Sequence, residues 1–489
     1  MSKQAITLIG AGPVGALLAQ LLARHGFAVQ VFEKRIDPRR TGFVRGRTIN
    51  LALAERGLQA LRTAGLAEEA LQRSVMMRGR MVHPLDGLSA LQRYGVDDSE
   101  VIWSISRSGL NALLIDAAEA VGVAFHFGQT LKTADIDAQR LTLVDEHHVQ
   151  REYHANMLIG ADGAGSALRA AMNLHQPLGI RVEPLGHGYK ELEIPRAAGS
   201  DRFAIEPHAL HIWPRGGHMC IATPNITGSF NVTLFLPLHG PDPSFETLPD
   251  AAAASAFFRR DFPDLLPLMP RFAEDYDGHP VGTLATLYLD RWHIDGRAVL
   301  VGDAAHAIAP FHGQGMNCGF EDAVMLAELL ADADMPAADA FAEFQRIRKP
   351  NADAIAAMTL ENYVEMRDSV VDPAYVAKLE LGNRLAERAP NHFMPRYRMV
   401  TFTHLSYAYA YERARAQDQL LEQLLRESPD AGELSLDAAV STLQAALPPL
   451  PPLRMDSQPE RAPVIADRAV RFESKPTVEK DADYLLQNE

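Results

Sequence analysis

The stretch that decides the fold is residues 5–33, AITLIGAGPVGALLAQLLARHGFAVQVFE. Two apolar runs, residues 5–9 and 28–32, predict strands buried in a sheet, and the helical spacing of apolar positions in residues 14–25 predicts a helix between them. This order predicts the first strand–helix–strand unit of a Rossmann-like α/β domain that binds a dinucleotide.

The turn between the first strand and the helix has the sequence GAGPVG. Gly10 allows a tight turn, Gly12 lets a pyrophosphate approach the backbone, and Gly15 lets the helix pack closely on the strand. Glu33 lies 21 residues after Gly12, where a carboxylate can accept hydrogen bonds from ribose hydroxyls. Because an acid there would repel a 2′-phosphate, we expect the resident ligand to be FAD or NAD.

Two other predicted strands also end at an acid. Residues 157–163, MLIGADG, contain Asp162, and residues 298–303, AVLVGD, end at Asp303. Since the carboxyl ends of parallel strands share one edge of a sheet, all three turns should meet at the ligand-binding edge. The sequence has no second complete GxGxxG unit, so we do not expect a separate nicotinamide domain.

Asp303 is followed by a glycine-containing loop, residues 310–315, that leads into a helical pattern near Met316. A helix N-terminus without bulky side chains suits electron-rich ligand atoms. The same segment also fits a strand, a turn and a core helix in any α/β protein. Arg47 and Arg107 are candidates for phosphate contacts, although each taken singly also fits a surface arginine.

The composition is that of an ordinary globular protein of two to four domains, with 489 residues, 47% hydrophobic and 22% charged. A formal charge of −15 without a basic run argues against nucleic acid and favours small-molecule partners. Cys220 and Cys318 have no metal-ligand spacing, so we predict neither a metal site nor a disulfide scaffold. We find no secretory leader and no apolar window long enough to span a membrane, and expect a cytoplasmic protein.

A second pattern, of period two, covers residues 187–194, 209–214, 218–222 and 229–236. It predicts an inserted antiparallel sheet whose inward face could form the roof of a substrate cavity, or which could be purely structural. The sequence then becomes helical, with a break or kink expected at Pro350.

These patterns predict an α/β fold: a Rossmann-like FAD-binding domain with an inserted antiparallel-sheet substrate domain and a C-terminal helical region. The expected segments are FAD-binding residues 1–75, 101–178 and 291–330, substrate-domain residues 76–100 and 179–290, helical residues 331–427, and a flexible tail, residues 428–489, with a short helix near 436–447.

GAGPVG with Glu33, GADG at residues 160–163 and GDAAH at residues 302–306 together resemble the single-component FAD-dependent aromatic hydroxylases, over nearly all of residues 3–425. The resemblance implies that the first site binds the ADP half of FAD and that Asp162 serves both FAD and transiently bound NADPH. It also implies that Asp303 contacts the pyrophosphate and ribityl chain. Further cofactor contacts would come from Gly315, Met316 and Asn317.

Within this family, the chain most resembles the kynurenine-hydroxylating branch, through residues 47–53, 77–81, 187–192, 213–216, 233–237, 313–317, 362–366 and 395–397. The resemblance implies a substrate-carboxylate site with charge-assisted and neutral donors, which would be Arg80, Tyr94, Asn362 and Tyr397. It implies an aromatic pocket with Phe235 and Met366. The resemblance also implies that residues 310–315, the flavin loop, lie over the flavin. We expect the substrate-site residues, distant in sequence, to converge above this loop.

The resemblance also implies the reaction. NADPH reduces FAD, O2 adds at flavin C4a, and the hydroperoxide converts L-kynurenine to 3-hydroxykynurenine. No side chain is needed as a nucleophile, and the catalytic candidates are the flavin-loop residues Pro310, His312, Gly313, Gln314 and Gly315. His312 is the one titratable side chain among them and is a candidate for proton transfer.

Other functions remain open at this point. They are hydroxylation of another aromatic acid, or a non-catalytic flavin-binding sensor or interaction module. Flavin halogenation is disfavoured because the WxWxIP stretch of the halogenases is missing. The oligomeric state, monomer or homodimer, is not predicted.

Overall fold

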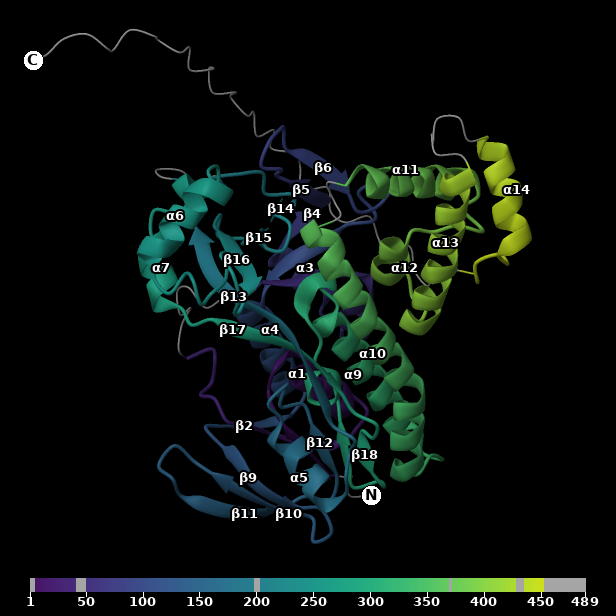
Figure 1. The fold of residues 1–489 in the computed structure, drawn as a ribbon. Helices are drawn as coiled ribbons and strands as arrows, with labels where there is room; N and C mark the ends of the chain where they lie inside the picture. Colours follow the sequence, from purple (N-terminus) through teal and green to yellow (C-terminus); the bar gives the residue numbers. More distant parts are fainter. Residues whose placement is uncertain (1–4, 41–49, 198–202, 369–371, 428–434, 453–489) are drawn as a thin grey trace, which may run out of the picture. The chain divides into compact units, whose positions relative to one another are not determined.

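The computed structural model describes residues 5–40, 50–197, 203–368, 372–427 and 435–452 (Figure 1). Residues 1–451 form one compact unit. Arg47 lies outside the described residues, so its predicted role stays a prediction.

The first sheet contains the nucleotide-binding unit and has six strands. Their spatial order is β18 (His293–Ile294), β19 (Ala298–Leu300), β12 (Leu158–Gly160), β1 (Ala5–Ile9), β2 (Ala28–Glu33) and β8 (Ala124–Phe127). All neighbours are parallel except β18 and β19. The register pairs Ile9 with Gly160 and Gly160 with Leu300, so β1, β12 and β19 end at one level of the same edge. The predicted α/β fold is confirmed.

The turn after β1 shows why glycine is needed at two positions. Gly10 has φ +106°, and a Cβ there would lie 2.4 Å from the carbonyl oxygen of Ala161, after β12. Gly15 lies in α1 (Pro13–Arg24), where a Cβ would lie 2.1 Å from the carbonyl oxygen of Gly10. The helix therefore packs directly on the turn. On its other sides α1 contacts α4 (Arg107–Ala120) and α9 (Gly315–Ala331).

The second sheet has seven strands. Their order is β17 (Gly282–Tyr288), β13 (Arg181–Ile194), β16 (Phe230–Pro237), β15 (Met219–Pro224), β14 (Leu210–Pro214), β5 (Gly79–Val82) and β6 (Ala90–Arg93). The predicted antiparallel pairing is found except between β14 and β5, which are parallel. This exception arises because β5 comes from a much earlier segment rather than from a hairpin with β14.

One face of this sheet is built from cross-strand rows that follow from the register. Tyr189, Phe235 and Met219 form the first row, and Glu191, Thr233 and Ile221 form the second. The opposite face packs against α6 (Ala251–Asp261) and α7 (Phe272–Gly278) in an apolar cluster. The side chains of these rows therefore lie on the face of the sheet that is not covered by α6 and α7.

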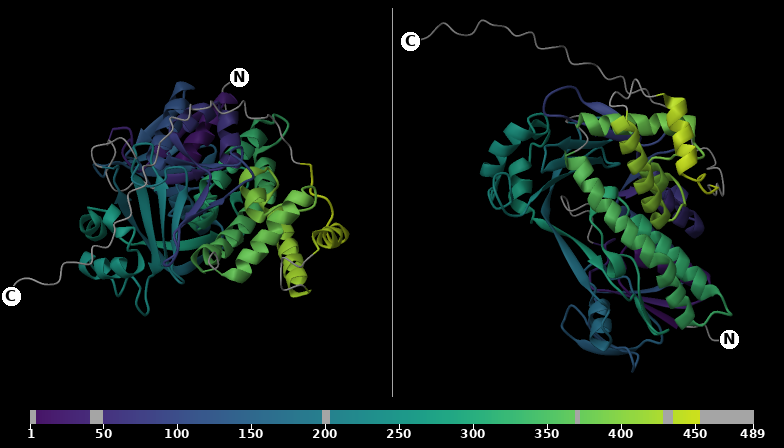
Figure 2. Two further views of the ribbon diagram at one scale, coloured as in Figure 1. Left: turned by 90° about the horizontal axis from the view of Figure 1, so that it is seen from above. Right: turned by 45° about the vertical axis from the view of Figure 1, so that its right-hand side comes forward.

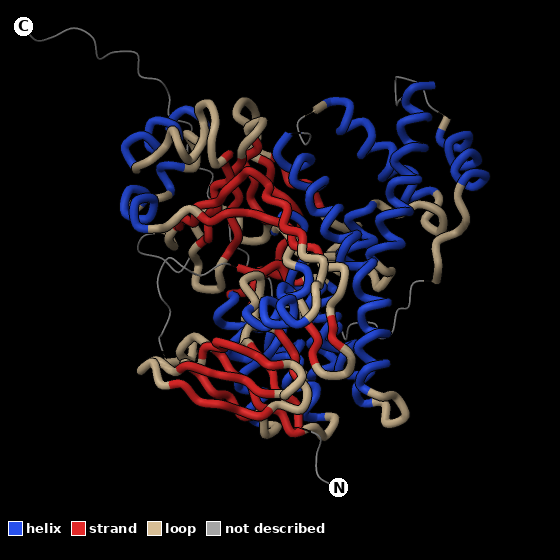
Figure 3. Tube along the Cα trace, turned by 60° about the horizontal axis from the view of Figure 1, so that its bottom comes forward, coloured by secondary structure: helices blue, strands red, loops and turns tan. Residues whose placement is uncertain are grey.

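Two smaller sheets complete the strand content. One consists of β9 (Thr130–Asp135), β10 (Arg140–Val144) and β11 (Gln150–His154); the other consists of β3 (Asn50–Leu53), β7 (Ile102–Ser106) and β4 (Ser74–Met77). Figure 3 shows the strands in two main groups, with helices alongside both.

The C-terminal helices follow α9 (Figure 2). They are α10 (Ala337–Asp368), α11 (Pro373–Arg388), α12 (Arg396–Phe402), α13 (Tyr407–Glu427) and α14 (Leu436–Ala446). Of the break or kink expected at Pro350, the break is wrong, because α10 continues through this residue, and the kink stays a prediction. Contacts of α10 with α9 and α13 support the helix there. In α14, which lies in the segment expected to be flexible, Ala439 and Leu443 are buried against α11 and α13.

Replacing Gly15 tests the packing of α1 on the turn. Gly15→Ala should destabilise the apoprotein by about 2 kcal/mol or more, since backbone must move to admit the new methyl group. Gly12→Ala is the matched control, because no protein atom lies within 4 Å of a Cβ at that position. Equal melting temperatures for the two variants in thermal unfolding would contradict this reading of the turn.

Candidate active site

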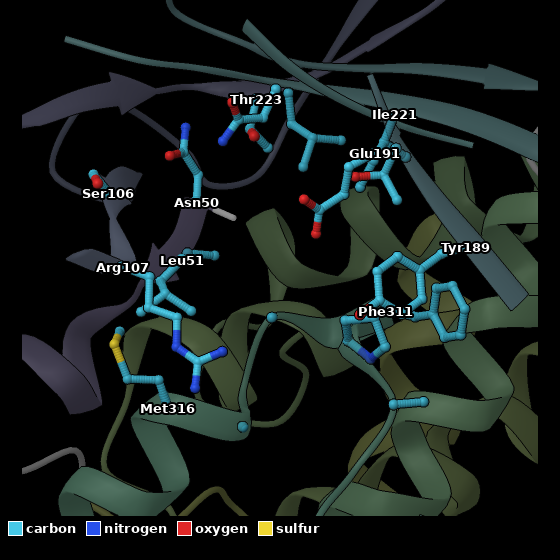
Figure 4. A pocket seen from close by; sticks show the side chains of 18 of the residues that line it. Asn50, Leu51, Ser106, Arg107, Tyr189, Glu191, Ile221, Thr223, Phe311 and Met316 are labelled. Carbon is cyan, nitrogen blue, oxygen red and sulfur yellow. The ribbon is translucent and has the colours of Figure 1, made fainter. Parts of the chain in front are cut away.

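A cavity of about 880 Å³ extends from the strand ends of the first sheet to the inward face of the second. Gly12, Ala161 and Asp303 line it where β1, β12 and β19 end. The two cross-strand rows form another wall, so the predicted cavity roof is found. Figure 4 shows Tyr189 and Glu191, both on β13, and Arg107, on α4, projecting into this space.

The cavity fits a dinucleotide at the end formed by the strand ends. Gly12 faces open space, which leaves its backbone accessible to a phosphate. Gly302 has φ +56°, a conformation that favours glycine, and it turns the chain so that the exposed Asp303 side chain is part of the lining. Arg107, the first residue of α4, adds a cation. Polar and charged groups thus surround the space expected for the pyrophosphate and ribityl chain.

Glu33 and Asp162 are not among the lining residues. The Glu33 carboxylate accepts hydrogen bonds from the backbone N–H groups of Ala11 (2.8 Å) and Arg35 (2.9 Å). Asp162 accepts from the Ser166 hydroxyl (2.5 Å) and from the N–H of Ala167 (2.7 Å), the first residue of α5 (Ala167–His175). Both carboxylates therefore hold turns whose neighbouring residues line the cavity, and their predicted ligand contacts remain predictions.

A buried ionic network lies behind Asp303. Asp322 is completely buried and accepts hydrogen bonds from the Gly302 N–H (3.1 Å), from Arg348 Nε (2.6 Å) and from His306 Nε2 (2.5 Å). Burial alone would raise the pKa of Asp322, but His306 and Arg348 lower it to about 2. Although Cys318, His306 and Asp322 lie close enough to share a metal ion, Arg348 already donates to Cys318 and Asp322. The network holds the Gly302 turn.

The loop between Asp303 and α9 presents backbone to the cavity. It contains a short 3-10 helix, Pro310–His312, followed by Gly313 with φ +66°. Pro310, His312, Gly313 and Gly315 line the cavity, as does Met316. Gln314 does not line it: this side chain is 2% exposed and its Oε1 accepts a hydrogen bond from the Tyr407 hydroxyl (2.9 Å).

Asn317 does not line the cavity; its side chain holds the loop in place from behind. Its side-chain amide donates to the carbonyl oxygens of Ala52 and Gly313, both at 2.8 Å, and its Oδ1 accepts from the Ala54 N–H (3.0 Å). Asn317 thereby fixes the loop against the end of β3. A direct contact between this side chain and the cofactor would require these hydrogen bonds to be exchanged.

His312 is mostly buried, although it lines the cavity. The side chain is 5% exposed, its ring stacks on Tyr397 with centroids 5.3 Å apart, and its Nδ1 has no hydrogen-bond partner. Burial, together with the nearby Arg396 guanidinium, lowers the pKa of His312 to about 3. A neutral ring is thus expected at physiological pH, which favours packing over the proton-transfer role considered from the sequence.

At the other end of the cavity, the four predicted carboxylate-site residues converge. Arg80 on β5 is 9% exposed, and its Nη2 lies 3.5 Å from Oδ1 of Asn362. The guanidinium carbon lies 5.8 Å from the Tyr94 ring centroid and 5.2 Å from that of Tyr397. The two tyrosine rings stack on each other at 4.8 Å. Segments far apart in sequence thus form one cationic pocket.

An aromatic pocket adjoins Arg80. Phe235 lies 5.0 Å from Phe311 between ring centroids, and Phe311 stacks on Tyr363 at 4.0 Å. Met366 belongs to the same apolar cluster. Phe311 was not predicted from the sequence, although it lies inside the predicted flavin loop. Tyr189 and Glu191 were also missed, and the period-two pattern that places them on the face of Phe235 could have identified them.

The chain matches the family model of the FAD binding domain over residues 3–186 and 271–357. It is 54% identical to kynurenine 3-monooxygenase of Xanthomonas axonopodis pv. citri (strain 306) over 451 residues, which are 92% of this chain and 98% of that protein. It is 52% identical over 450 residues to the enzyme of the same name from Stenotrophomonas maltophilia (strain K279a), with the same coverage of both chains. The chain belongs to the kynurenine 3-monooxygenase family.

Membership in this family makes the chain a flavin-dependent aromatic monooxygenase with FAD as its cofactor. Solved structures support the fold. 2-Methyl-3-hydroxypyridine-5-carboxylic acid oxygenase aligns with a TM-score of 0.62 at 23% identity, over 77% of this chain and 96% of the other. P. aeruginosa PqsL, in complex with 2-aminobenzoylacetate, aligns with a TM-score of 0.59 at 22% identity, over 75% and 97%.

No helix in the described part of this family member combines the length and apolar composition needed to cross a membrane.

Replacing Gly12 tests the cofactor end of the cavity. In Gly12→Ala the new methyl group would project toward the FAD pyrophosphate, so the dissociation constant for FAD should rise about tenfold or more, which is ~1.4 kcal/mol. Titration of apoprotein with FAD measures this change. An unaltered FAD affinity would show that the pyrophosphate does not approach Gly12.

Replacing His312 tests its neutral state. The folded-state pKa of about 3 lies below the ordinary 6.5, so only the unfolded chain takes up this proton as pH falls from 6.5 toward 3. Folding stability should therefore decline over that window, by about 1 kcal/mol per pH unit. His312→Gln should lose less stability than the wild type between pH 7 and pH 5.5 in thermal unfolding with saturating FAD. His147→Gln, at an exposed position, should behave like the wild type; equal losses in all three proteins would contradict the assignment.

Proposed function

We propose that this chain hydroxylates L-kynurenine to 3-hydroxykynurenine, with NADPH as the reductant and O2 as the oxygen source. The observation that carries the proposal is the convergence of Arg80, Tyr94, Asn362 and Tyr397 beside an aromatic pocket. Relatives at 52% to 54% identity that bear the name kynurenine 3-monooxygenase support the choice of substrate.

The site suits an aromatic amino acid in two ways. A carboxylate needs a charge-assisted donor, and the buried guanidinium of Arg80 can supply a bidentate one, with hydroxyl donors from Tyr94 and Tyr397. The aromatic ring of the substrate can then extend toward Phe235 and Phe311, which offer apolar contact. Glu191, in the second row of the roof, adds a carboxylate to the cavity wall.

Bound FAD, once reduced, supplies the chemistry by which one oxygen atom of O2 reaches the substrate ring. The task of the side chains is to bind, orient and exclude water. Phe235 and Met366, together with Phe311 of the loop itself, form an apolar wall, and each is at most 7% exposed. The aniline nitrogen of kynurenine makes its ring electron-rich, so no protein nucleophile is needed. Gly313 and Gly315 present backbone rather than side chains at this boundary.

A rival substrate is a different aromatic acid, which the same guanidinium could bind. The two functions separate by product analysis with NADPH and O2. We expect 3-hydroxykynurenine to form from kynurenine, and faster than any hydroxylated product from simple aromatic acids. NADPH consumption that yields only hydrogen peroxide with kynurenine would defeat the proposal, and a flavoprotein inert to NADPH would favour a binding module.

Replacing Arg80 tests substrate recognition. Arg80→Ala should retain FAD but weaken kynurenine binding by on the order of 2 to 4 kcal/mol, because a carboxylate would be left without its buried charge partner. The matched control is Arg78→Ala. Arg78 lies two positions earlier, pairs with Asp98 at 2.9 Å and does not line the cavity. Equal substrate affinity in Arg80→Ala and Arg78→Ala, measured by titration of the flavin absorbance, would rule out the assigned role.

A further inference from the structure

The flavin loop is held from behind by three C-terminal helices. Asn362 on α10 donates from Nδ2 to the carbonyl oxygen of Phe311 (2.6 Å). Tyr397 on α12 stacks on His312. Tyr407, the first residue of α13, donates its hydroxyl to Oε1 of Gln314 (2.9 Å). The first two residues belong to the predicted carboxylate site, whereas the third has no place in the substrate site described above.

In the Gly313–Gln314–Gly315 triplet, the two glycines face the cavity and Gln314 faces the C-terminal helices. Gly313 and Gly315 line the cavity, while Gln314 is absent from the lining and 2% exposed. Because Gln314 directly precedes the first residue of α9, the direction of its side chain is tied to the backbone of both neighbours. The hydrogen bond from Tyr407 therefore helps to fix the orientation of the loop backbone that lines the cavity.

The position of Tyr407 is itself fixed on several sides. Its ring is completely buried, and the guanidinium carbon of Arg56 lies 4.0 Å above the ring centroid. Arg56 on α2 (Glu55–Ala64) also pairs with Glu321 on α9 (2.8 Å) and donates to the Val400 carbonyl oxygen on α12 (2.7 Å). Tyr407 is thus held between the FAD-binding part and the C-terminal helices, so its hydroxyl has little freedom to follow a displaced Gln314.

We propose that Tyr407 is a positioning residue for the flavin: through Gln314 it holds the Gly313–Gly315 backbone against the isoalloxazine ring. The C-terminal helices then serve the cofactor as well as the substrate. The inference rests on the loop lying at the flavin, which is part of the proposed function, but it does not depend on which aromatic acid is hydroxylated.

The test removes one oxygen atom. Tyr407→Phe keeps the ring beneath Arg56 but leaves Oε1 of Gln314 buried without its donor, so the loop should relax. In the FAD-reconstituted full-length protein without substrate, we expect the FAD dissociation constant to rise on the order of 3- to 10-fold. The visible absorption bands and the midpoint potential of the bound flavin should shift. Tyr411→Phe, the same change one turn along α13, should leave all three at wild-type values.

Two outcomes would overturn the proposal. In the first, Tyr407→Phe lowers only the melting temperature and leaves FAD affinity, flavin spectrum and potential unchanged; this would show a purely structural role. The second concerns Gln314→Met, which removes the acceptor at similar volume. If Tyr407 acts through Gln314, the double variant should bind FAD no more weakly than Gln314→Met alone, and additive losses would refute that route. No measurement uses kynurenine, so a failed hydroxylation assay would leave these results interpretable.

Discussion

The parallel pairing of β1, β12 and β19 is the constraint on which the site depends. Their register brings the ends of the three strands to one level, so the turns that follow them must share the same edge of the sheet. The chain after β12 can pack against Gly10, and α1 can pack against the Gly10 turn through Gly15, because neither glycine has a Cβ. Asp322 then fixes the Gly302 turn that leads to Asp303. Backbone packing thus shapes the edge at which we expect the cofactor to bind, before any ligand contact is considered.

The second constraint is that the cofactor edge and the carboxylate site are joined by one loop. Residues of the loop line the cavity on one side and are held by α10, α12 and α13 on the other. Asn362 illustrates the connection, since its Oδ1 faces Arg80 and its Nδ2 donates to Phe311. A displacement of Asn362 at the predicted carboxylate site should therefore also displace the backbone of the loop, through one direct hydrogen bond.

The sequence was sufficient to predict the strands and helices that local patterns of apolar residues and glycines specify. The βαβ unit of residues 5–33 and the strands leading to Asp162 and Asp303 follow from apolar runs and glycine spacing, and the structure contains them. Side-chain direction could not be predicted in this way. Glu33 and Asp162 occupy strand ends as expected, yet each carboxylate is satisfied by nearby backbone N–H groups. Tyr407 was not identified from the sequence, because its contacts with Arg56 and Gln314 join residues that are distant in sequence.

The carboxylate site also shows why an anion is the expected ligand. The polar contacts of Arg80 to Asn362 and Glu365 are long, at 3.5 and 3.8 Å, and the faces of two tyrosine rings supply much of the surrounding surface. Ring faces offset part of the cost of burying a cation, but they provide no acceptor in the plane of the guanidinium fork. A bound carboxylate would provide two such acceptors at shorter range. A ligand without an acceptor at this position would leave the guanidinium with only its long contacts, so the site should bind it less tightly.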